Sequence, residues 1–271
     1  MSSEPAVEVV DLVKEYELGE IASLQHTVAL VRWRLGGERP RSDTVRALDG
    51  VSLSIGQGES VAILGRNGSG KSTLVKLISD VTVPTAGLIR VRGRVMPLLS
   101  VGAGFRVDLT GRENVMLLGS MLGLVRRDIA AAMEEIAEFA EIARAHLDTP
   151  VKRYSSGMRA RLSFAASLGL PAQVYILDEV LSAADDGFKE RAAQHLETLR
   201  DGGATIIFIS HELALLERIC QRGVWLDQGR VLREGAIDEI APEYHVYLLE
   251  LAEIKARNRG LRLEVEELPA P

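Results

Sequence analysis

The stretch that decides the fold is Gly65-Arg66-Asn67-Gly68-Ser69-Gly70-Lys71-Ser72-Thr73. It follows an apolar run, Val61 to Leu64, and precedes apolar residues at helical spacing, Leu74, Leu77 and Ile78. A strand, a glycine-rich turn and a helix in this order form a cradle in which backbone N–H groups surround phosphate oxygens. The positive end of the helix dipole favours the same anion. The stretch therefore predicts a phosphate-binding loop.

Lys71 and Ser72 give this loop its expected chemistry. The ammonium group of Lys71 can reach the β- and γ-phosphates of a nucleotide, and the hydroxyl group of Ser72 can bind Mg²⁺. We therefore expect a nucleoside triphosphate and Mg²⁺ at residues 65–73. These residues alone leave open whether the nucleotide is ATP or GTP.

Composition limits the class of protein. The chain has 271 residues, of which 46% are hydrophobic, enough for one large α/β domain or two small ones. A formal net charge of -6 argues against a general nucleic-acid binder. Cys220 is the only cysteine, so no intrachain disulfide can form and a reducing compartment is the simplest expectation. The sequence begins without the features of a secretory signal, and no run of about 18 apolar residues occurs. If the protein works at a membrane, we expect another chain to span it.

Apolar patterning predicts an α/β fold with a mainly parallel sheet covered on both faces. The runs 173–177 and 204–209 are apolar or β-branched, which is typical of strands inside a parallel sheet. Alternating residues at 7–16 and 47–55 predict an N-terminal antiparallel β portion. An insertion at about residues 17–44 separates these two segments.

The rest of the chain completes a P-loop NTPase core with an inserted helical subdomain. We expect one half-exposed strand at 88–95, a helical subdomain at about 100–170, a hairpin at 224–232, and a helix from Pro242 to about Arg259. We assign the nucleotide-binding domain to residues 1–240, and a C-terminal helix and tail to residues 241–271.

An apolar run, Val174 to Leu177, ends in two acids, Asp178 and Glu179. The carboxyl end of a parallel strand faces the ligand crevice, so Asp178 can hold Mg²⁺ while Glu179 polarises the attacking water. Side chains alternate along an extended strand, which predicts that the two acids point to opposite faces. Because they would point in different directions, Asp178 and Glu179 could have separate tasks.

A second anion site is expected where Tyr154-Ser155-Ser156-Gly157-Met158 precedes a helix. At this point the chain resembles the nucleotide-binding subunit of an ABC transporter. The segment resembles the family signature, usually Leu-Ser-Gly-Gly-Gln, with its Ser and second Gly kept. Ser182-Ala183-Ala184-Asp185 resembles the D-loop, His211 follows a strand as the switch histidine does, and Tyr16 resembles the aromatic residue that stacks on adenine.

The resemblance implies ATP as the nucleotide and a site shared between two subunits. One subunit supplies the phosphate loop, Asp178 and Glu179, and the signature of a second copy closes over the γ-phosphate. The implied catalytic residues are Lys71, Glu179 and His211, and the implied Mg²⁺ ligands are Ser72 and Asp178. Beyond residues 65–73, the implied ATP-binding residues are Tyr16, Ser155, Ser156, Gly157 and Asp185.

Three features are similar to one branch of the family, the ATPases of bacterial polysaccharide exporters. They are the Tyr-Ser-Ser-Gly-Met signature, the segment Leu98 to Phe105 before Leu109-Thr110-Gly111-Arg112-Glu113-Asn114, and the insertion after Tyr16. The usual Q-loop glutamine is missing from residues 88–113. About 30 residues follow Ile240, so we expect no appended carbohydrate-binding domain.

The branch implies an ATP-hydrolysing homodimer beneath two copies of a membrane-spanning permease. It would act at the cytoplasmic face of the inner membrane, power the export of a lipid-linked polysaccharide such as O-antigen, and bind no nucleic acid. Two alternatives stay open: a soluble, non-transport ABC ATPase, and a binding-only regulatory homologue, which the missing glutamine suggests.

Overall fold

Two β-sheets form the centre of the protein, which the computed structural model describes over residues 4–18, 43–98, 104–179, 181 and 185–266. The larger sheet has six strands in the order β5-β6-β7-β3-β8-β9. Their bounds are Ser60–Leu64 (β3), Val95–Leu98 (β5), Val174–Asp178 (β6), Thr205–Ile209 (β7), Arg222–Asp227 (β8) and Arg230–Ala236 (β9). Neighbouring strands pair in parallel, except that β8 and β9 form an antiparallel hairpin. The expected mainly parallel sheet is confirmed.

A smaller antiparallel sheet has the order β2-β1-β4, with β1 at Val7–Leu18, β2 at Asp43–Ile55 and β4 at Ala86–Val91. Its apolar face packs with β3 and with helix α2 (Lys71–Ile78) in one buried cluster. This cluster joins the N-terminal sheet to the back of the phosphate loop. The expected insertion at about residues 17–44 lies, apart from its ends, outside the described residues.

The expectation of one strand over 88–95 is wrong. The structure ends β4 at Val91 in the small sheet and begins β5 at Val95 in the large one. Gly93 turns the chain with a φ of +97°, and a Cβ there would lie 2.7 Å from the Cβ of Gln173. The Gln173 side chain then accepts a hydrogen bond of 2.7 Å from the Arg94 amide. A glycine turn of this kind is favourable because an L side chain rarely adopts a positive φ.

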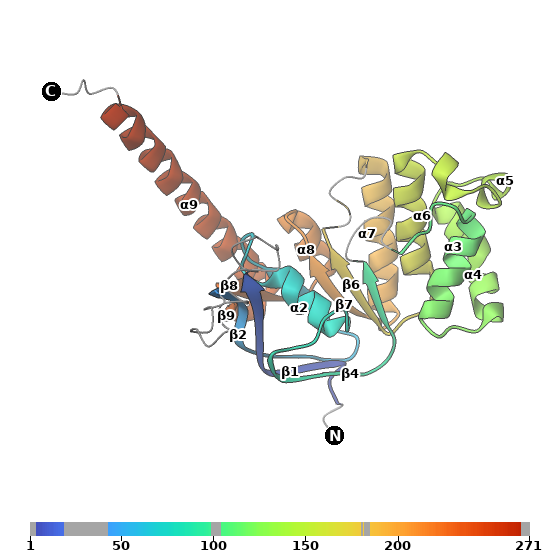
Figure 1. Ribbon diagram of the computed structural model, residues 1–271, viewed down its shortest axis with the longest axis horizontal. Coiled ribbons are helices and arrows are strands. Elements are labelled where there is room, and N and C mark those ends of the chain that lie inside the picture. The colour runs from blue at the N-terminus through green and yellow to red at the C-terminus, as the bar shows by residue number, and fades with distance from the viewer. Residues whose placement is uncertain (1–3, 19–42, 99–103, 180, 182–184, 267–271) are drawn as a thin grey trace, which may run out of the picture.

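The inserted helical subdomain is present at one end of the molecule (Figure 1). It consists of α3 (Gly111–Met121), α4 (Arg126–Phe139), α5 (Arg144–Leu147), a 3₁₀ turn (Val151–Arg153) and α6 (Ser156–Gly169). Thr110 and Glu113 form a reciprocal capping box that starts α3. The spacing of the buried side chains Ile129, Met133 and Ile136 gives α4 its apolar face.

Aromatic packing attaches this subdomain to α7 (Asp186–Asp201). The ring of Phe188 lies 5.6 Å from Phe139 and 5.4 Å from Phe164, between centroids. Tilted and edge-on ring pairs at this spacing are favourable beyond the area they bury. The helical subdomain and the helix that follows β6 therefore form one continuous core.

The C-terminal helix is longer than expected. The sequence pattern predicts a helix from Pro242 to about Arg259, but α9 runs from Ile237 to Glu266 and projects away from the domain (Figure 1). Ile237, Ile240 and Tyr244 are buried at its beginning. Their packing against the large sheet offsets the backbone hydrogen bond that Pro242 cannot make.

Substituting Leu162 by Ala tests whether α6 anchors the helical subdomain. Leu162 is fully buried, so we expect Leu162→Ala to lower the free energy of unfolding by about 2–5 kcal/mol. The control Leu232→Ala removes a side chain that is 58% exposed and is expected to change it by less than about 0.5 kcal/mol. The free energies are measured by urea unfolding. Equal losses of unfolding free energy in Leu162→Ala and Leu232→Ala would contradict the packing described.

Candidate functional site

The phosphate loop joins the buried strand β3 to α2, and two glycines allow its shape. A Cβ at Gly65 would lie 2.4 Å from the carbonyl oxygen of Leu226 and 2.5 Å from the Ser69 hydroxyl. Gly70, which precedes α2, has a φ of +107°, and a Cβ there would lie 2.7 Å from the Ala47 carbonyl oxygen. Any larger residue at either position would displace backbone. The amides of the loop can therefore face an anion at the N-terminus of α2.

Lys71 is the buried cation of this loop. Its Nζ donates hydrogen bonds to the Gly65 carbonyl at 2.5 Å and the Arg66 carbonyl at 3.1 Å. Only 7% of the residue is exposed. Burial lowers the pKa of the Lys71 ammonium, and the charges of Glu179 and Asp178 oppose this shift. The ammonium thus lies between loop carbonyls and the acids Asp178 and Glu179.

Asp178, the last residue of β6, faces the start of α2. Burial raises the pKa of its carboxyl group, while a hydrogen bond from the Ser72 hydroxyl lowers it. The negative charge of Glu179 raises the same pKa, and Lys71 lowers it. The structure therefore brings Ser72, Asp178 and Lys71 together.

Glu179 does not continue the strand, so the expectation of two acids on opposite faces of an extended strand is wrong. Its φ is +54°, and its amide donates to the Ile209 carbonyl at the end of β7 at 3.0 Å. This turn places its carboxylate 2.9 Å from Nε2 of His211. The side chains of Glu179 and His211 are 42% and 57% exposed. The two acids are thus separated by a bend of the backbone, and Glu179 points toward open solvent beside His211.

The donors at this edge fit Mg²⁺ bound together with a nucleotide. Mg²⁺ prefers oxygen ligands and is commonly held by one or two protein groups plus substrate phosphates. The hydroxyl of Ser72 lies close enough to the carboxyl group of Asp178 to lower its pKa, so both oxygen groups are at hand for one ion. Among the described residues no cluster of three or more His, Cys, Asp or Glu side chains could hold a metal alone. In such sites phosphate oxygens and water supply the remaining ligands.

Tyr16 lies near the end of β1 and is 39% exposed, so its ring is available to a ligand. It pairs with Val45 of β2, and the ammonium of Lys14 lies 4.9 Å from its ring centroid. The same strand β2 contacts the phosphate loop through Ala47. Stacking on adenine stays a prediction for this residue.

The signature residues lie away from the phosphate loop of their own chain. Ser155 caps α6 by accepting the Met158 amide at 3.1 Å, and Ser156 and Gly157 form its exposed first turn. Figure 1 shows α6 in the helical subdomain rather than beside α2. Tyr154, which replaces the usual leucine, is buried and donates to the His146 carbonyl at 2.6 Å.

Asp185 is the N-cap of α7 and accepts the Phe188 amide at 2.9 Å. Residues 182–184 of the expected D-loop lie outside the described residues, as do residues 99–103 of the Leu98 to Phe105 segment. Asp185 and Ser155 each cap a helix whose first residues are exposed. Their predicted contacts with nucleotide would require a second copy of the chain.

The family model described as ABC transporter matches residues 48–182, which include the phosphate loop, the signature and β6. The O-antigen export system ATP-binding protein RfbB of Klebsiella pneumoniae is 39% identical, over 73% of this chain and 80% of that protein. The chain belongs to the ABC transporter family.

Two longer ABC relatives support the same branch. The O-antigen export ATP-binding protein RfbB of Myxococcus xanthus is 39% identical over 88% of this chain. The teichoic acids export ATP-binding protein TagH of Enterococcus faecalis is 36% identical over 92% of it. The chain spans 55% and 54% of the length of these two relatives. The resemblance to polysaccharide exporters is thus confirmed.

Solved structures support the ABC fold. A dimeric ATP-binding cassette in a post-hydrolysis state, bound to ADP and phosphate, superimposes with a TM-score of 0.69 and 22% identity. The match covers 85% of this chain and 98% of that one. An ATP-binding subunit of another ABC transporter gives a TM-score of 0.68 at 24% identity. The expected fold class is confirmed.

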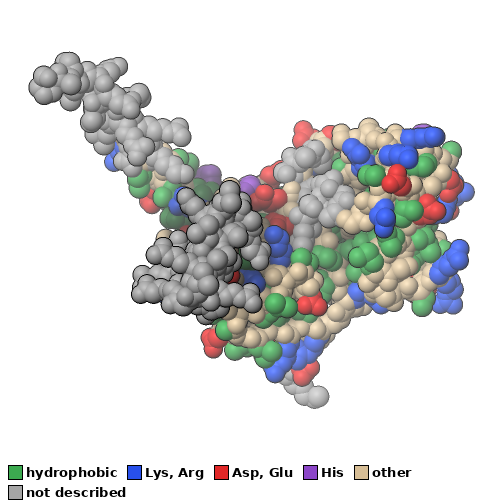
Figure 2. Space-filling model, in the orientation of Figure 1, with side chains coloured by type: hydrophobic (Ala, Val, Ile, Leu, Met, Phe, Trp, Pro, Cys, Tyr) green, Lys and Arg blue, Asp and Glu red, His purple; other side chains and the backbone are tan. Residues whose placement is uncertain are grey.

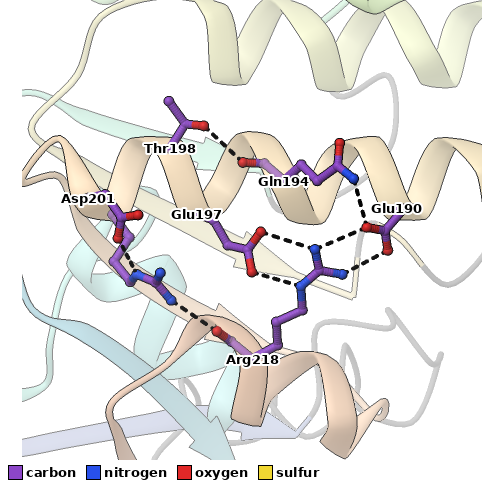
Figure 3. A network of polar contacts seen from close by, with 7 residues as sticks. Glu190, Gln194, Glu197, Thr198, Asp201 and Arg218 are labelled. Carbon is purple, nitrogen blue, oxygen red and sulfur yellow. Dashed lines mark hydrogen bonds and ion pairs between the residues drawn. The ribbon is translucent and has the colours of Figure 1, made fainter.

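A polar network that sequence reasoning missed ties α7 to α8 (Leu213–Ile219) (Figure 3). The guanidinium of Arg218 binds both Glu190 and Glu197 at distances from 2.7 to 3.1 Å. Lys189 also contacts Glu212, the residue after His211, at 2.7 Å. The helix capped by Asp185 and the segment that carries His211 are therefore linked. In the sequence, only the charges of these side chains and their helical spacing could have indicated this network.

Substituting Lys71 by Ala tests the cation of the phosphate loop. We expect Lys71→Ala to weaken ATP binding about tenfold or more, because a charged hydrogen-bond donor to the phosphates is lost. The control Lys76→Ala removes an exposed lysine from the same helix and should retain wild-type affinity. Isothermal titration with ATP in the presence of Mg²⁺ measures both variants. Wild-type affinity for ATP in Lys71→Ala would contradict the assignment of residues 65–73 to the ATP site.

Substituting Arg218 by Ala tests the α7–α8 network. Two carboxylates lose their shared partner, so the urea midpoint of unfolding should fall further than in Arg90→Ala, which breaks a single pair with Glu8. High salt should reduce the difference between the midpoints of the two variants because it screens exposed charges. Equal midpoints at low salt would show that the network does not stabilise the helix pair.

Proposed function

We propose that the protein is the ATP-hydrolysing subunit of an exporter that moves a lipid-linked polysaccharide, such as O-antigen, across the bacterial inner membrane. The observation that carries this proposal is the ATPase half-site at the edge of the large sheet, in a chain 39% identical to proteins named for O-antigen export. Another relative is named for the export of teichoic acids, which supports the export of a polymer.

The residues of the half-site have separate tasks in ATP hydrolysis. The loop amides and Lys71 would bind the β- and γ-phosphates, and Ser72 and Asp178 would hold Mg²⁺, which withdraws charge from the phosphates when bound. Glu179 would accept the proton of the attacking water. His211, 2.9 Å from that carboxylate, would orient it and contact the γ-phosphate. Tyr16 would stack on adenine.

A second copy of the chain would complete the site. Ser155, Ser156 and Gly157 begin a helix of the helical subdomain, and Asp185 begins α7. These residues would close on the nucleotide of the partner subunit. The solved relative named as a dimeric cassette with ADP and phosphate supports this arrangement by fold. ATP would then hold two subunits together until it is hydrolysed.

The proposed location is the cytoplasmic face of the inner membrane, beneath two permease subunits. No helix in the described part of the chain is long and apolar enough to cross a membrane. The protein would therefore attach through its permease partner and touch the polysaccharide only indirectly. On the face shown in Figure 2, basic side chains over the helical subdomain are interspersed with acidic ones. Together with a net charge of -6, this supports a partner other than nucleic acid.

The two alternative functions have less support. A soluble ATPase that acts on ribosomes or DNA does not match the export names of the relatives described above. A binding-only regulator would have no need for Glu179 and His211 beside the phosphate loop. Both residues are present and in contact.

Substituting Glu179 by Gln tests the catalytic part of the proposal. We expect Glu179→Gln to bind ATP normally and to reduce hydrolysis at least about a hundredfold, because the general base is lost. The ATP-bound variant should accumulate as a dimer in size-exclusion chromatography. The control Glu212→Gln removes a nearby carboxylate that contacts Lys189 and should retain most of the hydrolysis. Undiminished turnover in Glu179→Gln would exclude this residue as the base.

A further inference from the structure

The turn that ends α4 holds a glutamate in a backbone conformation that glutamate does not favour. Glu141 has a φ of +54°. Its amide donates to the Glu138 carbonyl at 3.0 Å, and the amide of Ile142 donates to the Ala137 carbonyl at 3.0 Å. These two bonds form a Schellman motif, in which the residue of positive φ is usually glycine. A glutamate there costs backbone free energy, so we expect its side chain to make an interaction that offsets the cost.

The carboxylate of Glu141 binds arginines from two other helices. Its Oε2 accepts from Nη1 of Arg161 on α6 at 2.8 Å, and its Oε1 accepts from Nη1 of Arg191 on α7. Among the described residues, Glu141 is the only acid that either arginine contacts. The Nε atoms of both arginines are buried and have no hydrogen-bond partner in this part of the chain. One carboxylate therefore compensates two cations that are only partly hydrated.

The two helices that Glu141 joins are those expected to face the nucleotide of a second copy. Arg161 lies in the second turn of α6, which Ser155 caps, and Arg191 lies in the second turn of α7, which Asp185 caps. Figure 1 shows α6 and α7 side by side. An ion pair from one carboxylate to both helices restricts how far either helix can shift along the other.

We propose that Glu141 is a positioning residue of the shared ATP site, whose carboxylate holds the starts of α6 and α7 in the relative position that the second copy's nucleotide requires. The inference rests on the proposed function in one respect, that two copies close on ATP. Glu141 touches neither nucleotide nor metal and acts through Arg161 and Arg191. Its loss therefore weakens closure of the dimer and leaves the chain's own phosphate loop intact.

ATP-dependent dimerisation in the Glu179→Gln background tests this role. Two substitutions remove the carboxylate, Glu141→Gln and Glu141→Gly, and the control Glu134→Gln breaks an exposed pair with Arg144 on the same subdomain. By analytical ultracentrifugation with MgATP, we expect both Glu141 variants to raise the dimer dissociation constant about tenfold and the control to match the parent. Affinity for MgADP should stay within about twofold in every variant, because ADP lacks the γ-phosphate over which the partner closes.

Urea unfolding of the same variants separates positioning from general stability. Glycine adopts a positive φ without strain, so the unfolding midpoint should fall less in Glu141→Gly than in Glu141→Gln, although both lose the same dimer affinity. Dimer affinity that recovers together with stability in Glu141→Gly would overturn the proposal. Parental dimer affinity in both variants, or a matching loss of MgADP affinity, would also overturn it. A Glu179→Gln parent that stays monomeric with MgATP would instead refute the shared site of the proposed function, and the role of Glu141 with it.

Discussion

The burial of one ammonium group, that of Lys71, is the constraint on which the site depends. A buried charge is costly unless hydrogen bonds and opposite charges compensate it. Here the compensation comes from the carbonyls of Gly65 and Arg66 and from the acids Asp178 and Glu179. The loop after β3 and the end of β6 must therefore meet at one edge of the sheet. The strand order allows this because only β7 separates them, and β7 leads to His211.

This constraint explains which features could be predicted from sequence. The phosphate loop is a contiguous motif, and its shape follows from glycines whose role is local. Asp178 could be placed because an apolar parallel strand ends at it, and such ends share one edge of the sheet. The fold class followed from the alternation of strands and helices around these two landmarks.

The features that were mispredicted depend on contacts between distant residues. The bend at Glu179 depends on a hydrogen bond to Ile209, some thirty residues away in the chain. The division of residues 88–95 between two sheets depends on Gly93 meeting Gln173. Likewise, α9 begins at Ile237 because β8 offers it an apolar surface, whereas Pro242 alone suggested a later start. Local patterning carries no information on such pairings.

The exposure of Glu179 and His211 suggests a physical reason why ATP hydrolysis would require a second subunit. The side chain of Glu179 is 42% exposed, so water surrounds much of its carboxylate. A partner subunit that closes over this carboxylate would remove that water and strengthen the interaction with His211. Asp178 is already in such an environment, since burial raises its pKa within a single chain. On the proposed assembly, the carboxylate of Asp178 is therefore desolvated already in the monomer, whereas that of Glu179 would lose its water only on closure.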